Sequence, residues 1–138
     1  MPDKESIRLS LPARPENVAV VRQVLSALTD ALGLPPAVAE DMRLAVTEAC
    51  TNIVRHAYPD CEGPIEIVVR TSGDILEVVV ADAGRGIGAS PDTAGPGLGL
   101  GLIAALADSL EIERTGSAGS RLVMGFPRSR AASRMSVA

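Results

Sequence analysis

Two long segments of the 138-residue chain carry apolar residues at intervals of three and four positions. This spacing puts the apolar side chains on one side of a helix, so it predicts amphipathic helices over residues 15–32 and 36–57. Gly33 separates the two helices, and the turn-forming residues 58–60 end the second. A third, shorter helix is expected over residues 97–106.

Shorter segments alternate apolar and polar residues or are rich in β-branched residues, as strands are. We expect five strands, over residues 5–11, 65–71, 75–81, 110–114 and 121–126. Residues 72–74, Ser-Gly-Asp, suit a hairpin turn between the second strand and the third. The strands cluster in pairs instead of alternating singly with helices. The order therefore predicts an α+β fold: a two-layer α/β sandwich with a mostly antiparallel sheet and helices on one face.

Two segments lack any such pattern. Residues 83–96 are rich in Gly, Pro, Asp and Ser, and a loop of this length inside a compact domain usually serves as a lid or another functional segment. Residues 128–138 are mostly Arg, Ser and Ala, with little to bury, and are expected to form a disordered tail. The sequence thus predicts one domain over residues 1–127, which is long enough to bury a hydrophobic core.

The composition argues against nucleic-acid binding. Apolar residues make up 46% of the chain, but there is one Phe, one Tyr and no Trp, so stacking of bases on aromatic side chains is not expected. The net charge is −4, and because the three arginines of residues 128–138 carry +3, the rest of the chain carries −7. A domain that acidic is a poor match for the DNA backbone.

Cysteine, histidine and lysine are scarce. Cys50, Cys61 and the single His56 fall short of a structural zinc set, and Cys50 is expected to be a reduced core thiol. With no signal peptide and no run of ~20 apolar residues, a cytoplasmic protein without membrane contact is expected. The only lysine, Lys4, lies near the N-terminus. P-loop enzymes and eukaryotic-type protein kinases place a lysine against nucleotide phosphates, so both classes are excluded.

The second predicted helix carries polar residues four positions apart. Glu48, Asn52 and His56 share one stripe, with Arg55 at its edge. An amide oxygen can help to hold a hydrated Mg²⁺ ion that takes its other ligands from water and phosphates. A carboxylate one turn away can accept a proton. The alternative is a helix face that is simply solvated.

A second candidate follows the third predicted strand, in the sequence Asp82-Ala83-Gly84-Arg85-Gly86. A carboxylate at a strand end can accept a hydrogen bond from an exocyclic amine such as adenine N6. The two glycines permit a sharp turn and let a flat base come close. The alternative is an ordinary turn that ends a strand.

A third candidate is the glycine-rich run of residues 95–103, which leads into the third helix. Glycines allow the backbone to approach a ligand closely, and a helix N-terminus favours phosphate. The dinucleotide-binding fingerprint does not fit, because a long loop precedes the run and the Gly-x-Gly-x-x-Gly spacing is absent. The alternative is a segment that is merely flexible.

Three segments, taken in their order along the chain, resemble the nucleotide motifs of the GHKL ATPase superfamily. They are the E-A-x-x-N-x-x-x-H-A-Y pattern of residues 48–58, the D-x-G-x-G pattern of residues 82–86 and the glycine-rich residues 97–103. The short first pattern most resembles the bacterial anti-sigma-factor serine/threonine kinases, and the likeness covers roughly residues 5–127. It implies a sandwich of the Bergerat type and an ATP-dependent protein kinase.

The resemblance implies a role for each motif. Glu48 would be the general base that activates an attacking serine hydroxyl or water, and Asn52 would coordinate Mg²⁺. Asp82 would accept a hydrogen bond from adenine N6. Ser120 stands where the family usually has a threonine near the adenine, so a hydroxyl is kept. The glycines implied are Gly84 and Gly86 around the base, and Gly97, Gly99 and Gly101 along the phosphates.

The same resemblance implies a sigma factor and an anti-sigma-factor antagonist as protein partners, a homodimer, and ATP with Mg²⁺ as cofactors. Kinase members often carry a basic residue just before the glycine-rich segment, and residues 92–96 have none. An ATP-binding partner-switching module with little or no kinase activity is therefore the alternative. A two-component histidine kinase is disfavoured, because no phosphoacceptor helical hairpin is expected before residue 5.

Overall fold

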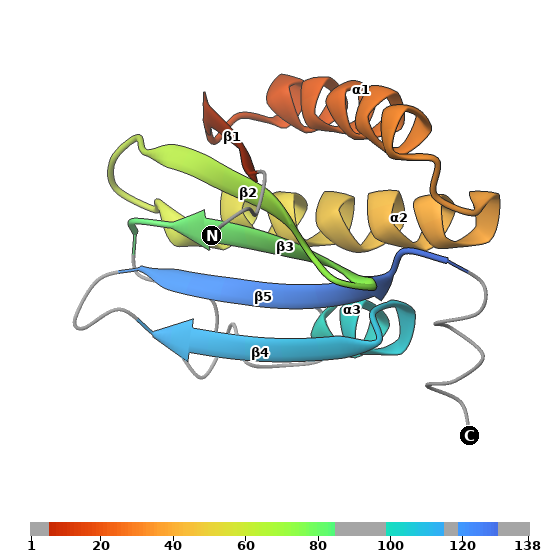
Figure 1. The fold of residues 1–138 in the computed structure, drawn as a ribbon. Coiled ribbons are helices and arrows are strands. Elements are labelled where there is room, and N and C mark those ends of the chain that lie inside the picture. Colours follow the sequence, from red (N-terminus) through yellow and green to blue (C-terminus); the bar gives the residue numbers. More distant parts are fainter. Residues whose placement is uncertain (1–5, 85–98, 115–118, 130–138) are drawn as a thin grey trace.

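One antiparallel sheet with a layer of helices on one of its faces makes up the fold (Figure 1). The computed structural model describes residues 6–84, 99–114 and 119–129. Within them the sheet has five strands in the order β1-β2-β3-β5-β4. The strands are β1 (Ser6–Pro12), β2 (Pro64–Ser72), β3 (Ile75–Asp82), β4 (Ser109–Arg114) and β5 (Ser120–Pro127). The helices are α1 (Pro15–Leu32), α2 (Pro36–Asn52) and α3 (Leu100–Leu106), with a π-helical turn, η1 (Ile53–Ala57), continuing α2.

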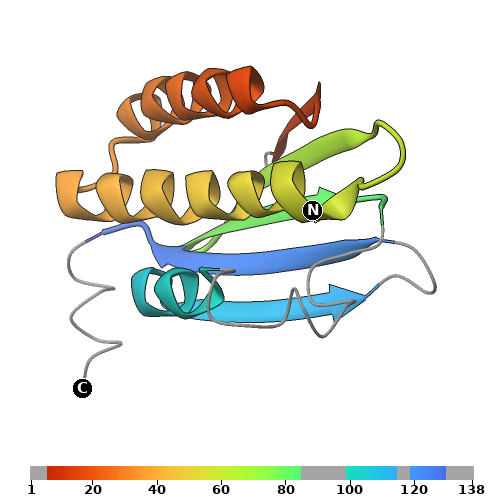
Figure 2. The same cartoon turned by 180° about the vertical axis from the view of Figure 1, so that it is seen from behind.

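The predicted fold class is confirmed. Each pair of neighbouring strands is antiparallel, and seen from behind, α1, α2 and α3 lie on the same side of the sheet (Figure 2). All five predicted strands are present, and no strand end differs from the prediction by more than one residue. The clustering of strands in pairs was sufficient for this result, because short connections favour antiparallel neighbours.

The β2–β3 hairpin turns tightly at Gly73 and Asp74. Gly73 has a φ of 61°, a left-handed value that glycine adopts at little cost. Arg128, just after β5, donates from its backbone N–H to Asp74 O at 2.8 Å and from Nη1 to Gly73 O at 3.0 Å. Arg128 is therefore bound to the hairpin turn of the sheet. The division into a domain of residues 1–127 and a disordered tail remains a prediction.

The two long helices meet at the glycine that the sequence pattern identified. Gly33 has a φ of 69°, and the N–H groups of Gly33 and Leu34 donate back to Asp30 O and Thr29 O, which closes α1. Pro36 begins α2 at a position where its missing N–H costs nothing. The predicted bounds of the first helix, residues 15–32, are confirmed.

The other two helices depart from their predictions in detail. The helix predicted over residues 36–57 has that extent, but its last five residues are wound as the π-helical turn η1. The third helix begins at Leu100, so its predicted start at residue 97 is wrong. Gly99 has a φ of 70°, and a left-handed residue cannot belong to a right-handed helix. Gly97 itself lies outside the described residues.

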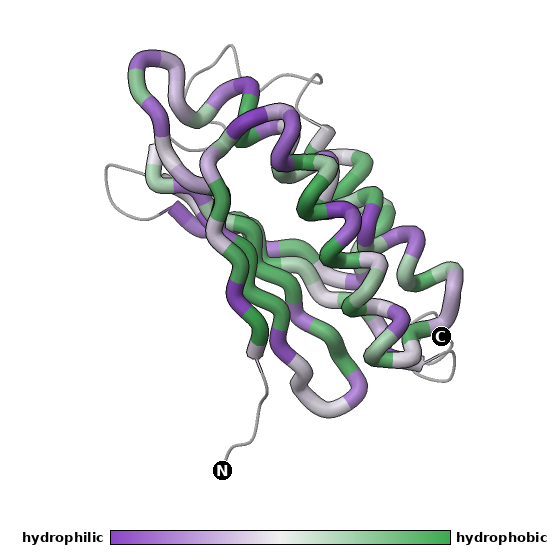
Figure 3. Tube along the Cα trace, turned by 90° about the horizontal axis from the view of Figure 1, so that it is seen from above, coloured by the Kyte–Doolittle hydropathy of each residue, from purple (hydrophilic) through white to green (hydrophobic). Residues whose placement is uncertain are grey.

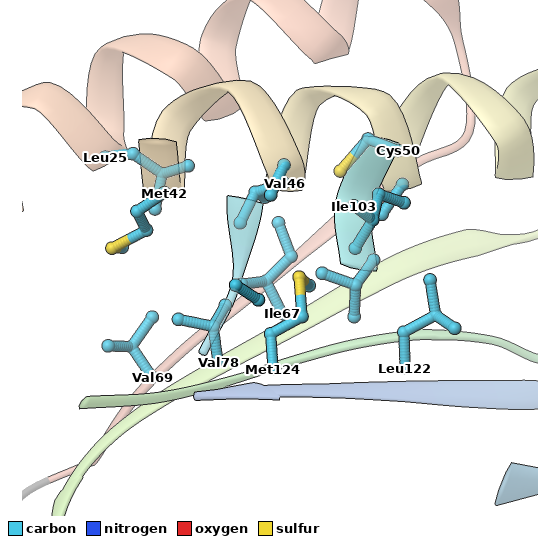
Figure 4. Close-up of a cluster of buried hydrophobic side chains, with 14 of the residues drawn as sticks. Leu25, Met42, Val46, Cys50, Ile67, Val69, Val78, Ile103, Leu122 and Met124 are labelled. Carbon is cyan, nitrogen blue, oxygen red and sulfur yellow. The ribbon is translucent and has the colours of Figure 1, made fainter. Parts of the chain in front are cut away.

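The hydrophobic core fills the space between the helices and the sheet (Figure 4). Hydrophobic residues dominate the strands, whereas hydrophobic and hydrophilic residues alternate along the helices (Figure 3). The core side chains of the central strands are every second residue, as strand geometry requires. They include Ile65, Ile67, Val69, Leu76, Val78, Val80, Leu122, Met124 and Phe126, which meet Leu25, Met42, Val46 and Ile103 from the helices.

Cys50 belongs to this core. It is a free, fully buried thiol, and burial raises its pKa to about 12, so it stays protonated at neutral pH. The prediction of a reduced core thiol is confirmed, while Cys61 is free and exposed. In the part of the chain that the structure describes, no helix combines the length and apolar character needed to cross a membrane.

A matched pair of substitutions tests the core. Leu122 is fully buried, so Leu122→Ala should lower the free energy of unfolding by about 2–5 kcal/mol, because it loses apolar burial and leaves a cavity. Ile112 is its cross-strand partner on β4 but is 45% exposed, so Ile112→Ala should cost less than about 1 kcal/mol. Urea unfolding measures both, and equal losses would contradict this placement of Leu122.

Candidate functional site

Residues of the predicted motifs meet at the end of the sheet where β3 stops and β5 starts (Figure 1). Asp82, the last residue of β3, is paired in register with Ser120, the first residue of β5. The turn after Asp82 contacts the end of η1. Asp82 and Ser120 are 38 positions apart in the sequence but adjacent in the fold. The end of η1, which is distant from both in the sequence, lies beside them.

The Asp82 carboxylate is held by donors on both of its oxygens. Its Oδ1 accepts a hydrogen bond from Gly84 N at 2.9 Å, and its Oδ2 accepts one from Ser120 Oγ at 2.9 Å. Both side chains are buried, with 7% of Asp82 and 2% of Ser120 exposed. Each carboxylate oxygen has more than one lone pair, so a fixed Asp82 can accept a further hydrogen bond from a ligand amine.

Gly84 is packed too closely for any side chain. A Cβ atom added there would overlap the carbonyl oxygen of Ala57 and lie 2.9 Å from Tyr58 Cδ1. Its own carbonyl oxygen accepts a hydrogen bond from Gly119 N. The turn is therefore clamped between η1 and β5, which explains the first glycine of the D-x-G-x-G pattern. The second, Gly86, lies outside the described residues.

The predicted polar stripe on the second helix has a graded exposure. Asn52 is the last residue of α2 and only 2% exposed, Glu48 and His56 are half-buried, and Arg55 is exposed. The alternative of a solvated helix face is wrong for Asn52, because its side-chain amide is buried. The π-helical turn begins directly after it, and such turns are frequent at functional sites.

Glu48 lies against the start of α3. A Cβ atom added at Gly99 would collide with the Glu48 carboxylate and lie 2.6 Å from Glu48 Cγ. Gly99 is also left-handed, so both its conformation and its surroundings require glycine. Gly101 lies within α3 with open space where a Cβ would be. Packing therefore accounts for the glycine at 99 but not for the one at 101.

Tyr58, the only tyrosine of the chain, was not singled out as a site residue from the sequence. Its hydroxyl donates to Pro64 O at 2.6 Å and accepts from Ala83 N at 2.8 Å. Burial raises the pKa of this phenol. A solitary tyrosine directly after a polar helix motif was the available signal, but sequence spacing alone does not show what it contacts.

The donor set fits a nucleotide with Mg²⁺ better than a metal held by protein alone. Within the described residues, no three His, Cys, Asp or Glu side chains are grouped so as to hold a metal ion. A buried amide such as that of Asn52 suits Mg²⁺, which keeps waters and takes phosphate oxygens. The two glycine positions that exclude a side chain, Gly84 and Gly99, bring the backbone of the Asp82 turn against Ala57 and the start of α3 against Glu48.

Comparison with known proteins agrees with this geometry. The family model for the histidine kinase-like ATPase domain matches residues 11–126. The chain belongs to this family. The match covers most of the described sheet and helices, including Glu48, Asn52, Asp82 and Ser120, so the GHKL resemblance seen in the sequence is confirmed.

Relatives of this histidine kinase-like ATPase domain include proteins named serine-protein kinase RsbW. The one from Bacillus mycoides (strain KBAB4) is 37% identical over 123 residues, which is 78% of this chain and 77% of that protein. The one from Bacillus thuringiensis subsp. konkukian (strain 97-27) is 38% identical over 124 residues, with the same coverage.

The fold is also present in a crystal structure of the RsbU and RsbW domains of a Mycobacterium tuberculosis protein. Its TM-score is 0.70 at 23% sequence identity, and the match covers 88% of this chain. This chain spans only 32% of that longer one. The likeness therefore establishes the fold of this histidine kinase-like ATPase domain.

The two described glycines of the third motif can be distinguished by alanine substitution. Gly99→Ala should destabilise the protein by about 1–2 kcal/mol or more, since Ala disfavours the left-handed conformation and its methyl group meets Glu48. Gly101→Ala should stabilise it by up to about 1 kcal/mol, because alanine favours a helix and finds open space. Thermal unfolding measures both; a harmless Gly99→Ala would contradict the contact.

Proposed function

We propose that the chain is an ATP- and Mg²⁺-dependent serine/threonine protein kinase. Its substrate would be an anti-sigma-factor antagonist, and it would also sequester a sigma factor. Membership of the histidine kinase-like ATPase family and relatives named serine-protein kinase RsbW support this proposal. Those names favour a kinase over the alternative of a binding module without phosphotransfer.

Adenine recognition is assigned to the Asp82 turn. The carboxylate would accept a hydrogen bond from adenine N6, and the Ser120 hydroxyl and Gly84 N–H hold it in one orientation for that purpose. A charged acceptor whose geometry is fixed in advance loses little entropy on binding. Gly84 would shape this pocket by holding the turn against η1, and Gly86, farther along, would let the base lie close to the backbone.

The phosphates are assigned to the glycine-rich segment. The backbone of Gly97, Gly99 and Gly101 would lie along them, and Asn52 would coordinate Mg²⁺. When bound, this ion neutralises charge on the phosphates. The burial of Asn52 supports its role, because a buried amide in a fixed position loses little freedom when it becomes a ligand.

The contact between Glu48 and Gly99 carries the kinase proposal. It places a half-buried carboxylate beside the segment proposed to hold the phosphates. Glu48 would accept the proton of a substrate serine hydroxyl as that oxygen attacks the terminal phosphorus of ATP; the bond from this phosphorus to the bridging oxygen breaks, and ADP leaves. Such proton transfer by a positioned side chain contributes typically 10²–10⁴-fold to a rate.

The surface between α1 and α2 suits contact with a partner protein. A groove there is lined by Arg22, Glu40, Arg43, Leu44 and Thr47. It offers charges of both signs together with an apolar side chain, as protein interfaces do. We assign a cytoplasmic location and a homodimeric state to the protein on the family resemblance.

Adenine recognition can be tested at Asp82. Asp82→Asn should weaken Mg·ATP binding by about tenfold to a hundredfold, because a hydrogen bond to a charged acceptor is lost and an amide donor can face the N6 amine. Calorimetric titration measures the affinity. Asp74→Asn, the same change in the exposed β2–β3 turn, should leave it unaltered. Unchanged binding by Asp82→Asn would remove the adenine assignment.

Phosphotransfer can be tested at Glu48. Glu48→Gln keeps the side-chain shape but removes the base, so transfer from labelled ATP to the antagonist's serine should fall about 10²-fold or more. Binding of Mg·ATP should change less than about twofold. Glu111→Gln, on an exposed position of β4, is the matched control and should transfer normally. A wild-type protein that binds ATP but transfers nothing would favour the binding-only alternative.

A further inference from the structure

The Tyr58 hydroxyl joins two backbone groups of neighbouring strands, at the end of the β2–β3 ladder that closes on Ile65 and Asp82. It donates to Pro64 O at the first residue of β2 and accepts from Ala83 N, the first residue after β3. One hydroxyl has one hydrogen to donate and lone pairs to accept, so both of these bonds are made at once. Ala83 lies between Asp82, the proposed adenine acceptor, and Gly84, whose N–H group donates to the Asp82 carboxylate.

The tyrosine ring is packed against two glycines, Gly63 and Gly84. A Cβ atom added at Gly63 would overlap the ring, and one added at Gly84 would lie 2.9 Å from Tyr58 Cδ1. A phenol is protonated at neutral pH, and burial raises the pKa of this one further, so its hydroxyl can donate to Pro64 O. Tyr58 follows η1 directly, which ties the ring position to the end of α2.

Tyr58 thus lies between the two halves of the proposed site. Glu48 and Asn52 belong to α2, while the Asp82 turn belongs to the sheet. We propose that Tyr58 is a positioning residue for nucleotide recognition, whose hydroxyl fixes the Ala83 peptide and so aims the Asp82 carboxylate at the exocyclic amine of the base. This inference rests on the proposed function, because it needs Asp82 to read an adenine.

The hydroxyl matters more for this orientation than for folding. Removing it leaves the ring and its contacts with Gly63 and Gly84 in place. Ala83 is exposed, so its N–H group can bond to water when the hydroxyl is gone. The turn would then keep its place in the fold while the Ala83 peptide loses its fixed direction. Tyr58→Phe should therefore change nucleotide discrimination more than stability.

The test compares two nucleotides on the whole chain. Calorimetric titration gives the affinity for Mg·ATP and for the Mg²⁺ complex of purine riboside triphosphate, which lacks the exocyclic amine. Tyr58→Phe should weaken ATP binding roughly five- to tenfold, the effect of about one hydrogen bond. Binding of the analogue should change less than about twofold. In the Asp82→Asn background, Tyr58→Phe should cause no further loss for ATP, because both act on one contact.

Thr29→Val is the matched control. It removes another hydroxyl hydrogen bond, from buried Thr29 Oγ1 to Ser26 O at 3.1 Å in α1. It should lower the melting temperature without altering the preference for ATP over the analogue. Circular dichroism confirms that each variant is folded during the titrations.

The outcomes separate the two proposals. Equal weakening of both nucleotides by Tyr58→Phe, unchanged ATP binding, or losses that add to those of Asp82→Asn would each overturn the positioning role. If the wild-type protein shows no preference for ATP over the analogue, then the adenine assignment of Asp82 fails and the role of Tyr58 fails with it. If the wild type prefers ATP and Tyr58→Phe keeps that preference, only the inference about Tyr58 fails.

Discussion

The site depends on a backbone contact between the two layers of the fold. Gly84, after the last residue of β3, lies directly against the carbonyl group of Ala57 at the end of η1. No side chain fits between them, so the sheet end and the helix end approach as closely as two backbones can. Because of this approach, the acidic turn of the sheet lies beside the helix that carries Glu48 and Asn52.

A second glycine contact involves the same helix. Gly99 lies against the Glu48 side chain, so Gly84 and Gly99 are each explained by the group that lies against them, whereas packing does not explain Gly101. The two acidic residues of the site, Asp82 and Glu48, differ in their burial. Asp82 is buried and held by Ser120 and Gly84, as suits a fixed acceptor, whereas Glu48 keeps partial exposure, as suits a group that exchanges protons.

Much of this was predictable from local patterns, and the errors have local causes. Helix periodicity gave the bounds of α1, and strand pairing gave the antiparallel sheet, because both follow from which side chains must be buried together. The start of α3 was placed three residues early, since an apolar, glycine-rich run does not show which glycine is left-handed. Ser120 was found through family resemblance, and its bond to Asp82 required the β3–β5 register.

The sequence by itself determined the class of the fold and the types of residue available for nucleotide chemistry: an acid and an amide one helical turn apart, an acid at a strand end, and glycines at fixed spacing. Only the tertiary structure decided which of these are buried, which glycines are required, and that Tyr58 joins the helix end to the Asp82 turn. The reason is physical. Periodicity and spacing describe neighbours along one element, whereas these contacts join residues far apart in the chain through packing between layers.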